Sequence, residues 1–301
     1  MSIDSGNARE AEWKPGVLGR IRAALRRALL AIFGDRGERR FHGWYHRFLR
    51  AADRFDPPED GVSAAMLCAI AARSSTIIDV GANVGRYSWF LRRNAAAQST
   101  LFALEPHHGA AELLRYTIGG IPGCTVLELA ASDADGTASL MVPDGAFGSP
   151  VSGLAWIQGG ADKPTRTNAV VEIRRLDSLI DDGTITITVP AFLKIDVEGG
   201  ERSVLRGAVD LLWNCRPIIY FECQATSLAR HGETPEDVWA DLRQAGYRIY
   251  ANRSGRFGAM AAADASVVNY LAIPDLLGDE PLDARTTESV LNAWASRTSG
   301  G

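Results

Sequence analysis

Residues 77–87 read Ile-Ile-Asp-Val-Gly-Ala-Asn-Val-Gly-Arg-Tyr. Two β-branched residues lead into Asp79, and Gly81 and Gly85 bracket Asn83 before a helix-like run begins. This order predicts a strand, a tight glycine turn and a helix. A strand that feeds a helix through glycines brings backbone N–H groups and a helix N-terminus close to a ligand. We therefore expect a nucleotide-like cofactor here, with the Asp79 carboxylate facing the same crevice.

Strand and helix patterns alternate along most of the chain. The pattern predicts strands over 76–80, 100–104, 125–129, 136–142, 169–173, 190–197, 217–222, 247–250 and 267–273, and helices over 62–72, 84–93, 107–118, 176–180, 201–212 and 235–245. Such alternation is typical of an α/β fold with a mostly parallel sheet and helices on both faces. Residues 143–168, rich in Gly, Pro, Ser and Thr, are predicted to form a long loop, which in a compact domain is usually mobile or functional.

The chain divides into three predicted segments: an N-terminal basic helical extension over 1–58, the main domain over 59–275, and a C-terminal tail over 276–301 with a short helix near 287–296. Within the extension, residues 17–33 place apolar side chains at helical spacing, with arginines opposite and at the flank. One interpretation is an amphipathic helix that makes peripheral contact with an anionic membrane surface. The simpler one, which we favour, is a helix packed on the main domain or on a second subunit.

Composition narrows the classes of partner. The net charge of −4 is uneven, because residues 1–50 carry +6 and the remaining 251 residues carry −10. An acidic main body argues against a broad nucleic-acid surface. The four cysteines show no CxxC or zinc-type spacing, which favours reduced thiols in a cytosolic protein. No secretory signal or membrane span is recognisable, so we expect a cytoplasmic protein, membrane-associated only if residues 17–33 bind lipid.

The glycine turn has the pattern DxGxNxG and lacks the GxGxxG spacing with which a dinucleotide pyrophosphate is bound. A cofactor without phosphates, such as S-adenosylmethionine, needs only room beside the backbone and an anion for its ammonium group, which Asp79 could help to supply. Glu105 ends the next predicted strand, 24 residues after Gly81. A carboxylate there can accept hydrogen bonds from both ribose hydroxyls.

A third group of residues lies on the predicted strand over 190–197. Strand alternation puts Lys194, Asp196 and Glu198 on one face. A lysine in an apolar strand needs carboxylate partners, and Asp196 and Glu198 are the nearest candidates. Asp196 falls at the carboxyl end of the strand, where α/β sheets bind ligands. A purely structural ion-pair network is the alternative.

Five separated motifs occur in the order seen in one family. They are Ile-Ile-Asp-Val-Gly-Ala-Asn-Val-Gly (77–85), Leu-Glu-Pro-His (104–107), Leu-Asp-Ser-Leu-Ile (176–180), Leu-Lys-Ile-Asp-Val-Glu-Gly-Gly-Glu (193–201) and Arg-Pro-Ile-Ile-Tyr-Phe-Glu (216–222). Over roughly residues 62–273 the chain thus resembles the FkbM-type methyltransferases. The resemblance implies a class I, Rossmann-like methyltransferase fold and S-adenosylmethionine as donor. It also implies methyl transfer to a hydroxyl oxygen, often of a saccharide or secondary metabolite, so the expected partner is a small-molecule or glycan acceptor.

The chain departs from this family in two places. The helix after Glu105 carries Arg115-Tyr-Thr-Ile where these enzymes often have an asparagine. The insertion over 143–168 and the basic N-terminus have no counterpart that we can invoke, which leaves the acceptor open.

The resemblance also implies roles for single residues. Asp79, Gly81, Asn83 and Gly85 would line the methionine and ribose side of the donor, and Glu105 would bind ribose. Ala131 and Ser132 would bound adenine. Asp196 would stand beside the transferring methyl group, arranged by Glu198 and Lys194.

An alcohol is a poor nucleophile at neutral pH, so a base or a metal must assist. Our hypothesis is that Asp196 accepts the proton or orients the hydroxyl, with Glu222 the second candidate and His231 the third. We assign no dedicated metal ligands, although Asp196, Glu198 and Glu222 could instead hold Mg²⁺ through oxygen atoms. Two other functions stay open: an NAD-dependent oxidoreductase, and a non-catalytic binding or scaffold protein that keeps the fold.

Overall fold

The computed structural model describes residues 62–142, 156–157, 167–253, 256–275 and 284–298. They all belong to one compact unit formed within residues 46–301. The predicted N-terminal extension over 1–58, with its helix over 17–33, and most of the predicted loop over 143–168 lie outside the described residues. None of the helices that the described residues form is long and apolar enough to cross a membrane.

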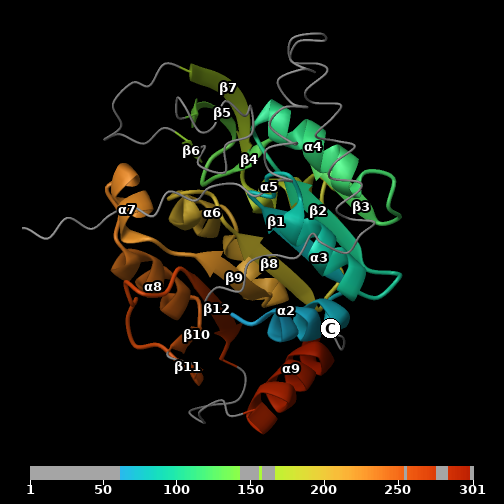
Figure 1. Cartoon of the computed structure of the whole chain (residues 1–301), viewed down its shortest axis with the longest axis vertical. Helices are drawn as coiled ribbons and strands as arrows, with labels where there is room; N and C mark the ends of the chain where they lie inside the picture. The colour runs from blue at the N-terminus through green and yellow to red at the C-terminus, as the bar shows by residue number, and fades with distance from the viewer. Residues whose placement is uncertain (1–61, 143–155, 158–166, 254–255, 276–283, 299–301) are drawn as a thin grey trace, which may run out of the picture. The chain divides into compact units, whose positions relative to one another are not determined.

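An eight-stranded sheet forms the centre of the unit (Figure 1). Five parallel strands come first: β1 Thr76–Val80, β2 Thr100–Leu104, β3 Cys124–Leu127, β8 Ala191–Ile195 and β9 Ile218–Glu222. Three antiparallel strands complete it: β12 Asn269–Pro274, β10 Tyr247–Arg253 and β11 Arg256–Ala259. The order is β11-β10-β12-β9-β8-β1-β2-β3, so the sheet is mostly parallel, as predicted. From β1 the chain adds β2 and β3 on one side of the sheet and then β8 and β9 on the other. The crevice beside the strands where this order reverses is where α/β folds bind ligands.

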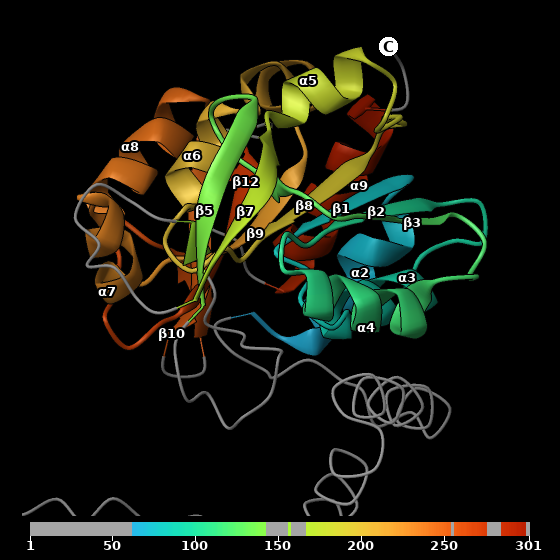
Figure 2. The same cartoon turned by 90° about the horizontal axis from the view of Figure 1, so that it is seen from above.

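Helices cover both faces of this sheet, because each central strand is apolar on both sides. One core contains Ile77 of β1 together with apolar side chains of α2 Ala64–Arg73, α3 Arg86–Asn94, α4 His108–Ile118 and α9 Ala284–Thr298. The other contains Ile78 and Val80 together with α5 Leu176–Asp181, α6 Glu201–Arg206 and α8 Pro235–Gln244. Figure 2 shows α2, α3 and α4 on the side of the sheet opposite α5. Successive residues of β1 therefore alternate between two cores.

The C-terminal helix α9 belongs to the first of these cores. Its Val290, Leu291 and Trp294 are buried there, and the Trp294 indole Nε1 donates to the Arg216 carbonyl at 3.1 Å. The short helix expected near 287–296 is therefore present and longer than predicted, over Ala284–Thr298.

A second, four-stranded sheet has the order β4-β7-β5-β6. Its strands are β4 Ala130–Ala131, β5 Gly136–Val142, β6 Trp156–Ile157 and β7 Thr167–Arg174. The prediction of a strand over 125–129 was therefore wrong at its end, since β3 stops at Leu127 and the next strand joins this other sheet. The predicted loop over 143–168 was also wrong at residues 156–157 and 167–168, which pair with β5.

Three further differences from the predicted elements lie in the segments after β8, β9 and β10. The helix expected over 201–212 ends at Arg206. The next residue, Gly207, packs on the backbone of Ser132, where a Cβ would lie 1.9 Å from the carbonyl oxygen. A π-helical turn, η1 Leu211–Cys215, follows. The short helices α7 Ala225–Leu228 and η2 Ala229–His231 and the strand β11 were not predicted, since each is too short to show a period.

Candidate active site

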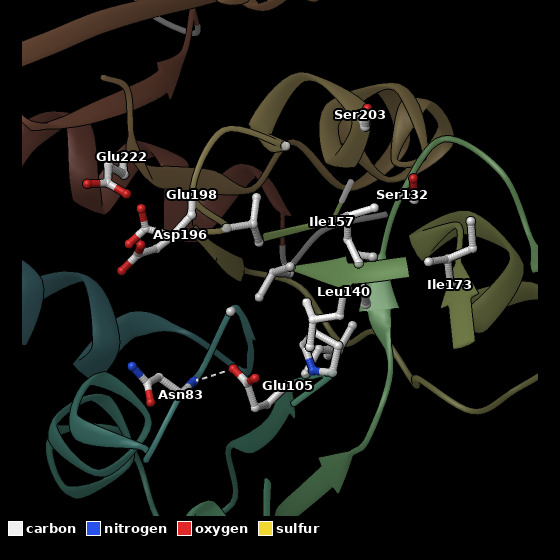
Figure 3. Close-up of a pocket in the computed structure, with 18 of the residues that line it drawn as sticks. Asn83, Glu105, Ser132, Leu140, Ile157, Ile173, Asp196, Glu198, Ser203 and Glu222 are labelled. Atoms are coloured by element: carbon white, nitrogen blue, oxygen red, sulfur yellow. Dashed lines mark hydrogen bonds between the residues drawn. The ribbon is translucent and has the colours of Figure 1, made fainter. Parts of the chain in front are cut away.

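A cavity of about 660 Å³ opens at the carboxyl ends of β1, β2, β8 and β9 (Figure 3). This volume lies in the range typical of sites for small molecules and cofactors. One end is polar and is lined by carboxylates that follow β8 and β9. The other end is lined by residues of the second sheet.

The glycine turn after β1 forms the floor of this cavity. The Gly81 and Ala82 amides donate to the Leu104 carbonyl at 3.0 and 2.9 Å, which ties the turn to the end of β2. Gly81 has φ +73, and a Cβ on it would lie 1.8 Å from the Asp196 carbonyl oxygen. Only glycine therefore lets the turn approach the segment after β8 so closely.

Glu105 follows β2 and is buried at the edge of the cavity. Its two carboxylate oxygens accept from the Asn83 and His107 amides, each at 2.8 Å; Figure 3 shows the first of these bonds. Burial raises the pKa of Glu105 to about 7, although both hydrogen bonds act to lower it. Asn83 supplies its amide from the left-handed region, with φ 49, which asparagine tolerates better than most residues.

A buried ion-pair network lies behind the turn. The Lys194 Nζ is 3.0 Å from Asp79 Oδ1 and 3.4 Å from Asp196 Oδ2, and it donates to the Gly81 carbonyl at 3.2 Å. Ser88 Oγ donates to Asp79 Oδ2 at 2.6 Å. Burial acts to lower the pKa of Lys194, but the Asp79 and Asp196 carboxylates outweigh it and raise the pKa above its usual value. Lys194 therefore stays protonated, and its ion pair fixes the Asp196 carboxylate from the buried side of the cavity wall.

Three carboxylates meet at the polar end of the cavity. Asp196, Glu198 and Glu222 each place an oxygen within 4.8 Å of the other two (Figure 3). Burial, with the Asp196 carboxylate close by, raises the pKa of Glu198 to about 7. Burial, together with the nearby Asp196 and Glu198 carboxylates, raises the pKa of Glu222 to about 9, although the hydrogen bond that Gln224 donates acts to lower it. Glu222 therefore keeps its proton at neutral pH.

The turn after β8 is held by the helices that follow it. The Glu201 Oε1 accepts from the Val197 and Gly199 amides at 3.2 and 3.1 Å. Gly199 has φ +114, and a Cβ on it would meet the Ser227 carbonyl of α7 at 2.3 Å. This close packing of α7 and η2 brings His231 to the cavity wall.

The opposite end of the cavity is largely apolar. Leu140, Ile157 and Ile173 of the second sheet face it beside Ala131 and Ser132 (Figure 3). A flat, apolar group is the kind of ligand that such a wall accommodates.

The structure brings most of the sequence-predicted site residues to this one cavity. Its lining contains Gly81, Asn83, Glu105, Ala131, Ser132, Asp196, Glu198, Glu222 and His231. Asp79, Gly85 and Lys194 are not in the lining. Asp79 and Lys194 are fully buried behind it, because they neutralise each other, and Gly85 caps α3 with φ +88, where a Cβ would meet Leu114.

Several lining residues were missed from the sequence. Gln224 and Tyr87 lie two residues after Glu222 and Gly85, and the strand-end rule could have found them. Asn269 could not be found, because nothing in the sequence says that β12 inserts between β9 and β10. The apolar wall was missed because part of it comes from the segment predicted to be a loop.

The sheet order, the glycine turn and the cavity at the switch point define a class I, Rossmann-like methyltransferase fold. A family model described as the methyltransferase FkbM domain matches residues 79–249, more than half of the chain, so the chain belongs to the FkbM methyltransferase family. No curated protein sequence matches the chain significantly.

Several solved structures resemble this one. A methyltransferase FkbM from Methylobacillus flagellatus KT is 17% identical with a TM-score of 0.40, over 67% of this chain and 44% of that one. An O-methyltransferase from Bacillus cereus in complex with SAH is 14% identical with a TM-score of 0.39, over 83% and 97%. A precorrin-6y C5,15-methyltransferase from Geobacter metallireducens GS-15 is 13% identical with a TM-score of 0.37, over 70% and 85%. At these values the likeness says nothing about what this chain methylates.

Proposed function

We propose that the protein is an S-adenosylmethionine-dependent O-methyltransferase that acts on a hydroxyl of a saccharide or secondary metabolite. Membership of the FkbM family supports methyl transfer. The observation that carries the rest is the arrangement of the cavity, with Glu105 and the apolar wall toward one end and three carboxylates at the other.

The residues present fit this donor. The Gly81 turn leaves backbone open beside the cavity, and Glu105 keeps lone pairs for ribose hydroxyls after accepting two amides. The Asn83 side-chain oxygen is buried at the same place and accepts no hydrogen bond from the protein. Leu140, Ile157 and Ile173 offer an apolar surface for adenine. When bound, S-adenosylmethionine supplies a methyl group activated by its sulfonium.

The protein's own task is then to align the acceptor oxygen and remove its proton. Glu222 is protonated at neutral pH, so it serves as a hydrogen-bond donor rather than as the base. Asp196 faces the same space, and Lys194 fixes its carboxylate from behind. We therefore assign the proton-accepting or hydroxyl-orienting role to Asp196, with His231 on the wall as a further polar group for the acceptor.

The alternatives make different predictions for ligand binding. An NAD-dependent oxidoreductase would need a phosphate cradle after β1, whereas the turn there lacks the GxGxxG spacing. Calorimetric titration with S-adenosylmethionine and with NAD⁺ tests the choice, and we expect heat only with the first. Binding of NAD⁺ alone would contradict the proposal. Binding of S-adenosylmethionine with no methyl transfer to any of a broad panel of hydroxylated acceptors would favour a non-catalytic binding protein.

Affinity for S-adenosylmethionine is expected to rise with pH between about 6 and 8. With a pKa of about 7, Glu105 is about one-tenth ionised at pH 6 and about nine-tenths at pH 8, and its carboxylate form accepts ribose hydroxyls better. Glu105→Gln should weaken binding by roughly tenfold or more at pH 8 and flatten this part of the pH dependence. Calorimetry at several pH values measures both effects.

The matched control is Glu128→Gln, which removes an exposed carboxylate that pairs with His108 and Arg115 outside the cavity. Its affinity should follow that of the wild type. An unchanged affinity in Glu105→Gln would show that Glu105 does not bind the donor.

A further inference from the structure

The three carboxylates at the polar end have the chemistry of a cation site. Asp196 and Glu198 follow β8, Glu222 ends the neighbouring β9, and one oxygen from each lies within 4.8 Å of the other two. All three are hard oxygen donors, and none of the cavity-lining residues that the structure describes is a cysteine. Oxygen ligands of this kind select Mg²⁺, Mn²⁺ or Ca²⁺ over zinc.

The buried side chain of Glu222 has unused hydrogen-bonding capacity. Glu222 is only 8% exposed, and its Oε2 accepts no hydrogen bond from the protein. Asn269 is 9% exposed and lies opposite Glu222 in the β9–β12 register. Both line the cavity. Buried polar atoms without partners are costly, so the persistence of this Glu222 oxygen points to a ligand that completes it.

The carboxylates at the polar end outnumber the cations that contact them. Four carboxylates belong to this region, those of Asp79, Asp196, Glu198 and Glu222. Two cations face them: Lys194 contacts Asp79 and Asp196, and the Arg230 Nη1 lies 3.9 Å from Glu198 Oε2. These carboxylates outnumber the two cations, so a bound divalent cation would reduce the repulsion that keeps Glu222 protonated in its absence.

We infer that Asp196, Glu198 and Glu222 bind one divalent cation of the Mg²⁺ or Mn²⁺ type, with waters or the acceptor as further ligands. The binding site stands on the geometry alone; only the role of the ion rests on the proposed function. There, the ion would bind the acceptor hydroxyl oxygen and lower its pKa, so that the O–H proton leaves more readily to Asp196.

The test is a titration of the full-length chain with Mn²⁺, without donor or acceptor, in which electron paramagnetic resonance measures the bound ion. We expect one saturable site that Mg²⁺ competes for. Glu198→Gln and Glu222→Gln should each weaken Mn²⁺ binding by about tenfold or more, because each removes a carboxylate ligand. Glu128→Gln is the control and should bind like the wild type. No saturable binding, or equal binding in the wild type and Glu198→Gln, would overturn the inference.

Glu198 is less buried than Glu222, so Glu198→Gln decides the matter if Glu222→Gln does not fold, with circular dichroism to show which variants are folded. Competitive displacement of Mn²⁺ by S-adenosylmethionine would also overturn the inference, since the carboxylates would then hold the cationic part of the donor.

The two hypotheses fail separately. Methyl transfer that persists in excess chelator, together with absent Mn²⁺ binding, would refute the cation site but not the methyltransferase function. A saturable Mn²⁺ site in a protein that binds no S-adenosylmethionine would refute the methyltransferase function but not the cation site.

Discussion

Asp196→Asn is expected to lower the rate of methyl transfer by about 10²- to 10⁴-fold, the usual worth of a positioned general base. Asparagine keeps the size of the side chain and can still contact a hydroxyl, but it cannot take up the proton. Affinity for S-adenosylmethionine should change by less than about tenfold, because Glu105, the glycine turn and the apolar wall stay in place. Single-turnover rates at saturating donor, with calorimetry for affinity, measure the two quantities separately.

The control is Asp210→Asn, which removes an exposed carboxylate that does not line the cavity. Its rate and affinity should equal those of the wild type. Wild-type turnover in Asp196→Asn would refute the role of Asp196 as base. An equal loss in donor affinity and rate would instead show that Asp196 acts in binding the donor.

Gly81→Ala is expected to destabilise the protein severely, by at least about 4 kcal/mol, and to abolish donor binding. The new Cβ would lie 1.8 Å from the Asp196 carbonyl oxygen, which belongs to the main chain and cannot rotate away. Relief of this clash must separate the β1 turn from the segment after β8, and both segments line the cavity. Denaturant unfolding monitored by circular dichroism gives the free energy of unfolding, and calorimetry gives the binding.

Gly183→Ala separates the clash from the backbone strain. Gly183 has φ +78, close to the +73 of Gly81, but a Cβ on it would meet no atom within 4 Å. It should therefore cost only about 1–2 kcal/mol, the strain of a left-handed residue. If the two variants were equally stable, the close approach of the Gly81 turn to Asp196 would be refuted.

The part of the fold that the sequence predicts is the part built from local patterns. The parallel strands β1, β2, β8 and β9 carry apolar runs bounded by Gly, Pro or acidic residues, so their places and their alternation with helices could be read directly. The second sheet could not. Its strands β4 and β6 have two residues each and are held only by pairing with β7 and β5, which is a property of the folded chain.

The candidate site shows the same division. Strand ends in a parallel sheet share one edge, which is why Gly81, Glu105, Asp196 and Glu222 could be grouped from spacing alone. Burial of Asp79 behind the cavity was not predictable, because whether a carboxylate at a strand end faces ligand or lysine depends on register. The register pairs Asp79 with Lys194 across β1 and β8, and the two charges neutralise each other out of reach of the cavity. Likewise, the raised pKa of Glu222 follows from burial beside Asp196 and Glu198, which spacing does not show.

A crystal structure of the full-length protein with S-adenosylhomocysteine tests the donor site and the role of Asp196 together. We predict that the ribose hydroxyls lie within hydrogen-bond distance of Glu105, that adenine packs on the wall formed by Leu140, Ile157 and Ile173, and that the sulfur faces Asp196 across the polar end of the cavity. A ligand bound outside this cavity, or one whose sulfur points away from Asp196, would contradict the proposed donor site and the role of Asp196 in methyl transfer.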